Sequence, residues 1–435
     1  MNTILYRNSR LWALLILTTL LGLSLLLESC TDHCTETIVY KYYEPVYTPL
    51  DEIRAAVKQE SPRPLKGVGK IYFKDGFLFV NEPNEGIHVI DNRDQKAPVV
   101  KSFIRIPGNF DLAIRNNSLY ADSYIDLVVF DISDLNNVSE VTRLEGIFSN
   151  YNSLGFYADA ELGVVTQWIE KEMPSVEFDC DTRFDAWGGI RFRNGIAMAD
   201  SRAFSSTMAL APGNSTGIGG SMARFTINHE HLYMLDAGNI ITADISLPSF
   251  PEKKSAQYLA WDIETIFPYE NRLFIGARSG MHIFDLTVPE NPEWITTYSH
   301  INSCDPVVVS GNYAYVTLRS GTQCDGFTNQ LEVLNISNIQ SPSLVKVYPM
   351  HNPHGLGIDD PVLFICDGDA GLKVYDATDK LNIDKKLLKH YKNIHAFDVI
   401  PFNNVLILIG EDGIFQYDYT DPLNIKFLSH IRVTK

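Results

Sequence analysis

Acidic, histidine and arginine side chains stand at the starts of several short apolar segments, where a shared site could form. Carboxylates that gather in one place can hold a hard cation such as Ca²⁺ through oxygen ligands, and histidines can add nitrogen ligands. The candidate binding residues are Asn109, Asp111, Arg224, Asp262, Asp305, His354, His395 and Asp398. A second set of acids lies in nearby turns, at Asp122, Asp126, Asp236, Asp367, Asp369, Glu411 and Asp412.

Each of these positions also has a structural explanation. Asp is a residue that hairpin turns favour, and an Asp at a strand start can bond the backbone of the next repeat. The acids lack the spacing of a twelve-residue calcium loop, and His354 and His395 have no third defined ligand. We therefore predict no cofactor and leave the metal content open, with Ca²⁺ as the cation that clustered carboxylates would select.

No catalytic motif stands in the context that its mechanism requires. Gly213-Asn-Ser-Thr-Gly217 matches the spacing of a nucleophile elbow, but an elbow needs a strand before the serine and a helix after it. Ala-Pro and Ile-Gly-Gly flank this copy instead. The sequence contains no His-Glu-x-x-His motif and no phosphate-binding loop ending in Lys-Ser or Lys-Thr. We assign no catalytic residue.

A repeated hairpin must position the polar side chains. In its clearest copy, Phe364 to Thr378, an apolar strand meets the polar turn Asp367-Gly-Asp-Ala-Gly371 and a returning strand. An Asp or Asn closes the second strand of every copy, at Asp91, Asp131, Asp179, Asp244, Asp285, Asn335, Asp376 and Asp418. The spacings of 40, 48, 65, 41, 50, 41 and 42 residues match the length of one propeller blade.

We therefore predict an all-β fold, a β-propeller of four-stranded blades over residues 67–435. A ring is favoured over a sandwich or solenoid because equal sheets close without long exposed edges. We expect eight blades, or seven if the third unit, which ends at Asp179, is not a blade. Strand starts and the turns inside the hairpins share one face of a propeller. The candidate binding residues would therefore line an acidic central funnel, and the closing Asp residues would accept backbone N–H groups at strand ends.

Two motifs of the array resemble a known repeat family. The segments Val-Ser-Gly-Asn-Tyr-Ala-Tyr-Val over 309–316 and Cys-Asp-Gly-Asp-Ala-Gly-Leu-Lys-Val-Tyr-Asp over 366–376 are similar to LVIVD repeats, as are the Asp-Ile-Ser and Asp-Ala-Thr endings. The resemblance covers nearly all of residues 69–430. It implies a β-propeller of the cell-surface lipoproteins found in Bacteroidetes-type bacteria, and it implies no activity and no catalytic residue.

The first 29 residues resemble a bacterial lipoprotein signal peptide. Arg7 and Arg10 precede an apolar run from Leu11 to Leu27, and Cys30 would be the lipidated first residue. An uncleaved membrane anchor is the alternative, because the apolar run nearly spans a bilayer. Both interpretations place the rest of the chain outside the cytoplasm, tethered to a membrane, and we expect the outer membrane or cell surface.

We predict that residues 30–66 form a tether that contains a short helix over 51–58. The segment Ser61-Pro-Arg-Pro64 would end this helix. Thr37 to Tyr47 could add a strand to the edge of a blade. The net charge of −17 and the lack of a basic patch exclude a nucleic-acid partner.

Two further features remain open. The segment at about 180–221 is an insertion rich in Ser, Ala and Gly, either a surface loop or a lid. Cys304 and Cys324 fall on the same face of one unit, so a disulfide between them is reasonable in an exported protein. The sequence does not fix that pairing, and Cys180 and Cys366 could be free buried thiols.

These observations favour a membrane-anchored binding or scaffolding module for a protein or glycan partner. The alternative is an extracytoplasmic enzyme, a hydrolase or lyase with its site in the funnel, which rests on analogy with other propellers. A deep pocket with perturbed carboxylates would favour the enzyme.

Overall fold

The structure is a computed structural model. It describes residues 35–38, 41–148, 158–172, 176–179, 220–300, 306–321 and 328–434. The chain forms two compact units, of which the first comprises residues 1–44 and 168–197 and the second residues 45–167 and 198–435.

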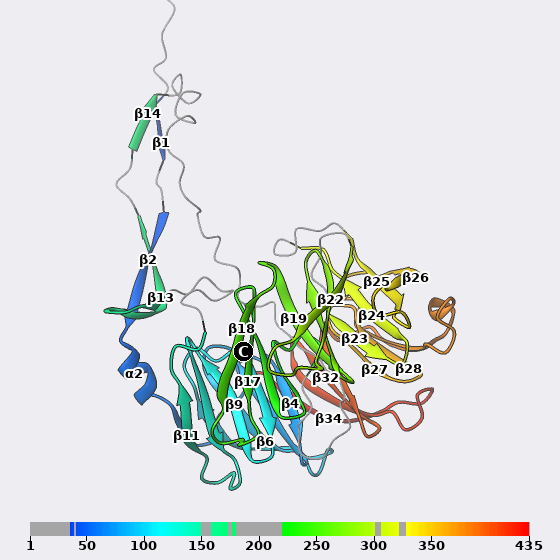
Figure 1. Cartoon of the computed structure of the whole chain (residues 1–435), viewed down its shortest axis with the longest axis horizontal. Coiled ribbons are helices and arrows are strands. Elements are labelled where there is room, and N and C mark those ends of the chain that lie inside the picture. The colour runs from blue at the N-terminus through cyan, green and yellow to red at the C-terminus, as the bar shows by residue number, and fades with distance from the viewer. Residues whose placement is uncertain are drawn as a thin grey trace, which may run out of the picture. The chain divides into compact units, whose positions relative to one another are not determined.

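The second unit is a β-propeller. The described residues form seven antiparallel sheets that each contain four consecutive strands, and we number these blades 1 to 7 in chain order (Figure 1). Blade 1 contains β4 (Ile71–Lys74), β5 (Phe77–Glu82), β6 (Gly86–Asp91) and β7 (Val99–Arg105). Blade 2 contains β8 (Leu112–Arg115), β9 (Ser118–Ser123), β10 (Asp126–Asp131) and β11 (Ser139–Leu144).

The middle blades follow the same plan. Blade 3 contains β15 (Phe225–Asn228), β16 (His231–Asp236), β17 (Asn239–Asp244) and β18 (Glu252–Tyr258). Blade 4 contains β19 (Ile263–Tyr269), β20 (Arg272–Ala277), β21 (Gly280–Asp285) and β22 (Glu293–Ser299). Blade 5 contains β23 (Val307–Ser310), β24 (Tyr313–Leu318), β25 (Gln330–Asn335) and β26 (Ser343–Pro349).

The last two blades complete the array. Blade 6 contains β27 (Leu356–Asp359), β28 (Val362–Cys366), β29 (Leu372–Asp376) and β30 (Leu387–Tyr391), with the short 3-10 helix η3 (Ile383–Lys385) before β30. Blade 7 contains β31 (Ala396–Phe402), β32 (Val405–Gly410), β33 (Gly413–Asp418) and β34 (Lys426–Arg432).

The two middle strands of each blade are apolar runs because both faces of the sheet are covered by neighbouring blades. Five of the six residues in β5 and in β10 are buried. The outermost strands have more exposed positions. In every blade the pairing of the third and fourth strands slips by one residue just before the closing Asp or Asn, for example between Ile283 and Phe284. Such a bulge increases the twist of the blade edge.

The ring closes between blades 7 and 1. Ile407 and Ile414 of blade 7 pack in one apolar cluster with Leu78 of blade 1. The amides of Asn92 and Gln416 exchange hydrogen bonds of 2.9 and 2.7 Å across this seam. Seven blades thus complete the ring, so the expectation of eight is wrong and the alternative of seven holds.

The third predicted unit is not a blade. Its closing residue Asp179 ends β14 (Val176–Asp179), which pairs with β1 (Thr35–Ile38). A separate sheet has the strand order β12 (Ala158–Asp159), β13 (Gly163–Glu172) and β2 (Lys41–Thr48). Because N-terminal strands supply these partners, the expected strand at Thr37 to Tyr47 does not join a blade edge.

Part of the predicted tether belongs to the propeller. The expected helix is present as α2 (Leu50–Ala55), and β3 (Lys58–Glu60) pairs with β7 as a fifth strand of blade 1. The side chain of Gln59 donates to the carbonyl of Leu135 at 2.9 Å and accepts from the N–H of Val138 at 2.8 Å. The propeller therefore begins before residue 67, earlier than the predicted boundary between tether and propeller.

Several predictions fall outside the described residues, namely those on Cys30, on Asp305, on the pair Cys304 and Cys324, and on nearly all of the insertion at 180–221. Cys366 is a buried free thiol. Within the described ranges, no helix has the length and apolar character needed to cross a membrane.

Candidate functional site

The closing residues of the blades are turn residues, as predicted. In all seven blades the side-chain oxygen accepts the backbone N–H two residues later, at 2.6 to 3.2 Å. At Asp285 the Thr287 hydroxyl and N–H lower the pKa of the carboxyl. These side chains stabilise the loops that follow the third strand of each blade.

Two of the predicted strand-start residues, Asp111 of blade 2 and Asp398 of blade 7, act electrostatically on the same lysine. This lysine is Lys70, just before β4, whose ammonium donates to the carbonyl of Met222. Burial lowers the pKa of Lys70, and the two carboxylates oppose this shift. The sequence reasoning missed Lys70, although it precedes β4 as Asp111 precedes β8. The predicted acidic funnel is therefore partly neutralised by lysine.

Asp111 connects two blades. Its carboxylate accepts the N–H of Leu112 at 2.7 Å and, across the seam to blade 3, the N–H of Phe225 at 3.1 Å. Burial raises the pKa of Asp111, and the charge of Lys70 and the N–H groups of Arg224 and Leu112 oppose this rise. Asp111 therefore binds the backbone of the adjacent blade, and this structural role alone can account for an acid at this strand start.

Asp122 lies beside Asp111, also as predicted. One of its oxygens accepts the N–H groups of Phe110 and Asp111, at 2.7 and 2.9 Å, and the side-chain amide of Asn109 at 2.8 Å. Burial raises the pKa of Asp122 to about 6 despite these donors. The cavity here, which Arg224 and Asp236 also line, measures about 20 Å³. This volume holds about one water molecule.

Asp262 and Asp398 have similar backbone partners. Asp262 accepts the N–H of Ser279 at 2.9 Å, and Asp398 accepts the N–H of Val399 at 2.7 Å. Asp262 directly precedes β19 as predicted, whereas Asp398 is the third residue of β31. Both contacts organise the backbone.

The two predicted histidines lie near each other, with ring centroids 6.4 Å apart. His354 is buried, and burial together with the charge of Arg319 lowers its pKa to about 2, so the ring stays neutral. The half-exposed His395 has Nδ1 at 3.0 Å from Asp369 and 3.3 Å from Glu411. His395, just before β31, thus contacts turn acids of blades 6 and 7. The prediction that strand starts and these turns share one face of the propeller requires such a contact. Among the described funnel residues, no three ligands lie close enough to share a metal ion.

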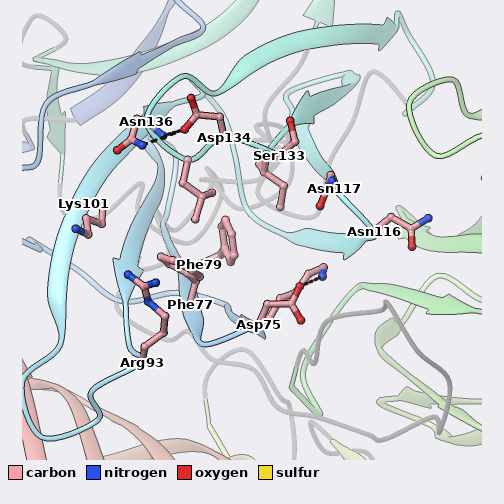
Figure 2. Close-up of a pocket in the computed structure, with 13 residues that line it drawn as sticks. Asp75, Phe77, Phe79, Arg93, Lys101, Asn116, Asn117, Ser133, Asp134 and Asn136 are labelled. Carbon is pink, nitrogen blue, oxygen red and sulfur yellow. Dashed lines mark hydrogen bonds and ion pairs between the residues drawn. The ribbon is translucent and has the colours of Figure 1, made fainter.

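A cavity of about 410 Å³ lies on the other face of the ring, between blades 1 and 2. Figure 2 shows its wall, which comes from the inner turns and the outer loops of both blades. This size is typical of a small-ligand site. Its polar lining consists of Lys74, Asp75, Arg93, Lys101, Asn116, Asn117, Ser133, Asp134 and Asn136, and its apolar lining includes Phe77 and Phe79.

Cationic groups and amides surround the aromatic wall of this cavity. The guanidinium of Arg93 lies over the ring of Phe77, 5.2 Å from its centroid, and donates to Asp91 at 2.9 Å. Lys74 is buried and forms an ion pair with the exposed Asp75. The sequence reasoning missed this site because its residues come from four separate loops and turns. The only signal was Asn116-Asn117, which reads as a hairpin turn.

No family model matches the chain, and no curated protein matches it. Among solved structures it is similar to the computationally designed Ika8 protein, with 12% identity, a TM-score of 0.49 and coverage of 86% of this chain and 92% of that one. Kluyveromyces lactis Hsv2 gives 9% identity, a TM-score of 0.46 and coverage of 82% and 96%. Saccharomyces cerevisiae Sqt1 gives 7% identity, a TM-score of 0.47 and coverage of 88% and 86%. Similarities of this size carry no argument about ligands.

Proposed function

We propose that this protein is a membrane-tethered binding module that holds an acidic glycan in the cavity between blades 1 and 2. The observation that carries the proposal is the lining of that cavity of about 410 Å³, where cations and amides surround phenylalanine rings. A sugar presents an apolar ring face and hydroxyl groups, and a uronic acid adds a carboxylate. The aromatic wall, the amides and the cations respectively suit these three parts.

Lys74 and Arg93 are the groups that favour an anionic sugar over a neutral one. The side chain of Lys74 is only 8% exposed, whereas that of its partner Asp75 is 79% exposed. A ligand carboxylate could replace Asp75 without burying a new charge on the protein. The side chain of Arg93 is 66% exposed, and Asp91 accepts from its Nε and one terminal nitrogen, so the other terminal nitrogen can donate to a ligand.

The membrane tether rests on the signal pattern that ends at Cys30, and the resemblance to LVIVD-repeat lipoproteins supports the same location. An enzyme in the central funnel is not proposed. The raised pKa of Asp122 is a feature of acid catalysts, but its carboxylate is bonded to backbone N–H groups beside a cavity of about 20 Å³. A cavity of that size does not admit a substrate.

Calorimetric titration of the purified protein with oligosaccharides tests the proposed ligand. We expect oligogalacturonate or another uronic-acid oligomer to bind, and the neutral oligomer of the parent sugar to bind at least about tenfold more weakly. Arg93→Met should weaken binding of the acidic oligomer by a similar factor. The matched control is Arg272→Met, which removes an arginine paired with Glu270 on a turn of blade 4. Equal binding of acidic and neutral oligomers, or an Arg93→Met variant that binds normally, would contradict the proposal.

A further inference from the structure

A histidine, an aspartate and a glutamate converge at the seam between blades 3 and 4. His231 begins β16 and Asp244 ends β17, and the two residues are cross-strand partners. Glu290 comes from blade 4, in the loop between β21 and β22. One ligand atom of each residue lies within 4.8 Å of the ligand atoms of the other two.

The imidazole of His231 has unused hydrogen-bonding capacity. Both ring nitrogens are buried, and neither has a hydrogen-bond partner among the described residues. Buried polar atoms are normally paired, because an unpaired one costs about 1–3 kcal/mol. Neither ring nitrogen of His231 has a hydrogen-bond partner in the described part of the chain, and two carboxylates lie beside the ring. Such a nitrogen is suited to coordinate a metal ion.

The loop that carries Glu290 is held in place by blade 3. The hydroxyl of Tyr233 donates to the carbonyl of Pro289 at 2.9 Å, and the hydroxyl of Ser255 donates to the carbonyl of Glu290 at 2.6 Å. The amide of Gln257 donates to the side chain of Asn291 at 2.6 Å. These contacts fix the loop on both sides of the carboxylate, as outer partners do around metal ligands.

The histidine is not part of the repeated framework. The residues that pair with the closing Asp or Asn in the other six blades are Phe77, Ser118, Arg272, Tyr313, Val362 and Val405. The turn chemistry of the closing Asp therefore does not require a histidine, and its presence in blade 3 needs another reason.

Lys254 is the cation that now balances the two carboxylates. Its ammonium lies 3.4 Å from Glu290 and 3.8 Å from Asp244, and it has a third partner in Glu252 at 3.0 Å. An incoming metal ion would displace the ammonium from the first two groups and leave it paired with Glu252.

We propose that His231, Asp244 and Glu290 bind a divalent first-row metal ion, with Zn²⁺ as the preferred occupant. One imidazole and two carboxylates are ligands that Zn²⁺ accepts, whereas Ca²⁺ and Mg²⁺ select sets of oxygen ligands. Three protein ligands leave one tetrahedral position for water. Because the ligands come from two blades, the bound ion would clamp the seam between them.

The test uses the full chain, purified without a histidine tag and stripped with a chelator, in calorimetric titration with ZnCl₂. We expect one Zn²⁺ to bind per chain at this site, and binding to weaken at least about tenfold in His231→Ala and in Glu290→Gln. Co²⁺ bound in place of Zn²⁺ should show visible absorption typical of low coordination number, and His231→Ala should lose it. The matched control is His395→Ala, which also removes a histidine beside two carboxylates.

A second variant keeps the test decisive if His231→Ala does not fold. Lys254→Met removes the competing ammonium, so it should tighten Zn²⁺ binding severalfold, and added Zn²⁺ should raise its Tm more than that of the parent protein. The proposal is overturned if the chain binds no Zn²⁺, if His231→Ala binds it unchanged, or if only His395→Ala loses it.

Discussion

Two aspartates of this protein show how position decides the behaviour of one residue type. Asp122 is half-buried beside Asp111, and desolvation raises its pKa to about 6. Asp285 lies at an exposed blade end, where the hydroxyl and N–H of Thr287 lower its pKa. The sequence places Asp122 in a turn and Asp285 at the end of a strand, and neither position reveals how strongly each carboxyl is desolvated.

The raised pKa of Asp122 predicts a pH-dependent stability. The folded state binds the proton of Asp122 more tightly than the unfolded chain, in which the pKa of Asp is about 4. The stabilisation that this difference gives to the folded state is therefore complete below about pH 4. It is lost as the pH rises through about 6. In Asp122→Asn this component should be absent. Between pH 4 and 7 the free energy of unfolding of the parent protein should fall relative to the variant by on the order of 2 kcal/mol.

Urea unfolding of both proteins at several pH values measures this difference, and the comparison cancels the titration of all shared groups. A difference that stays constant across the range would show that the carboxyl of Asp122 ionises normally in the folded state.

At the scale of the element, the closing hydrogen bond recurs together with a bulge in every blade. We expect Asp285→Ala to lower the free energy of unfolding by about 1 kcal/mol, because it removes the bond to the N–H of Thr287, which is 2.6 Å long. Asp285→Asn should retain most of the stability, since Asn335 makes the same contact with Ser337 in blade 5 at 2.9 Å. Thermal or urea unfolding of the two variants tests this, and equal losses in both would contradict the role of the side-chain oxygen.

Local chemistry explains which elements could be predicted from the sequence. A closing Asp followed by Ser or Thr sets its own turn, so strand ends and the phase of the hairpins follow from residues close in sequence. This phase correctly places Asp111, Asp122, His395 and Asp369 on one face. The segment ending at Asp179 has the same local pattern, but its partner β1 lies far away in the sequence, and no local signal identifies such a partner.

The sites were less predictable than the strands because they depend on contacts between blades. Asp111 was expected to face the centre, but its bond to Phe225 depends on the spacing of two neighbouring blades. The meeting of His231 with Glu290 likewise depends on a loop that crosses a seam. A repeat pattern defines each blade and says little about the residues that adjacent blades bring together.

At the scale of the whole molecule, the proposed lipid anchor is tested at Cys30. Replacing Cys30 with Ser should remove the acylated residue and release or mislocalise the protein. Metabolic labelling with a fatty acid, followed by fractionation of the cells, measures both effects. Label that persists in Cys30→Ser would contradict the lipoprotein prediction, and protease treatment of intact cells would report whether the propeller faces outward.

The short strand β3 also determines how the propeller responds to a pulling force. The three residues of β3 pair with β7, and Arg54 of the preceding helix bonds Asp126 at 2.8 Å. The seam of the ring begins only later, where Thr434 donates to the carbonyl of Leu65 at 2.7 Å. A load applied from the N-terminal side must therefore detach the helix and β3 before it reaches the seam. These two elements can peel away and lengthen the link while the seven blades stay closed.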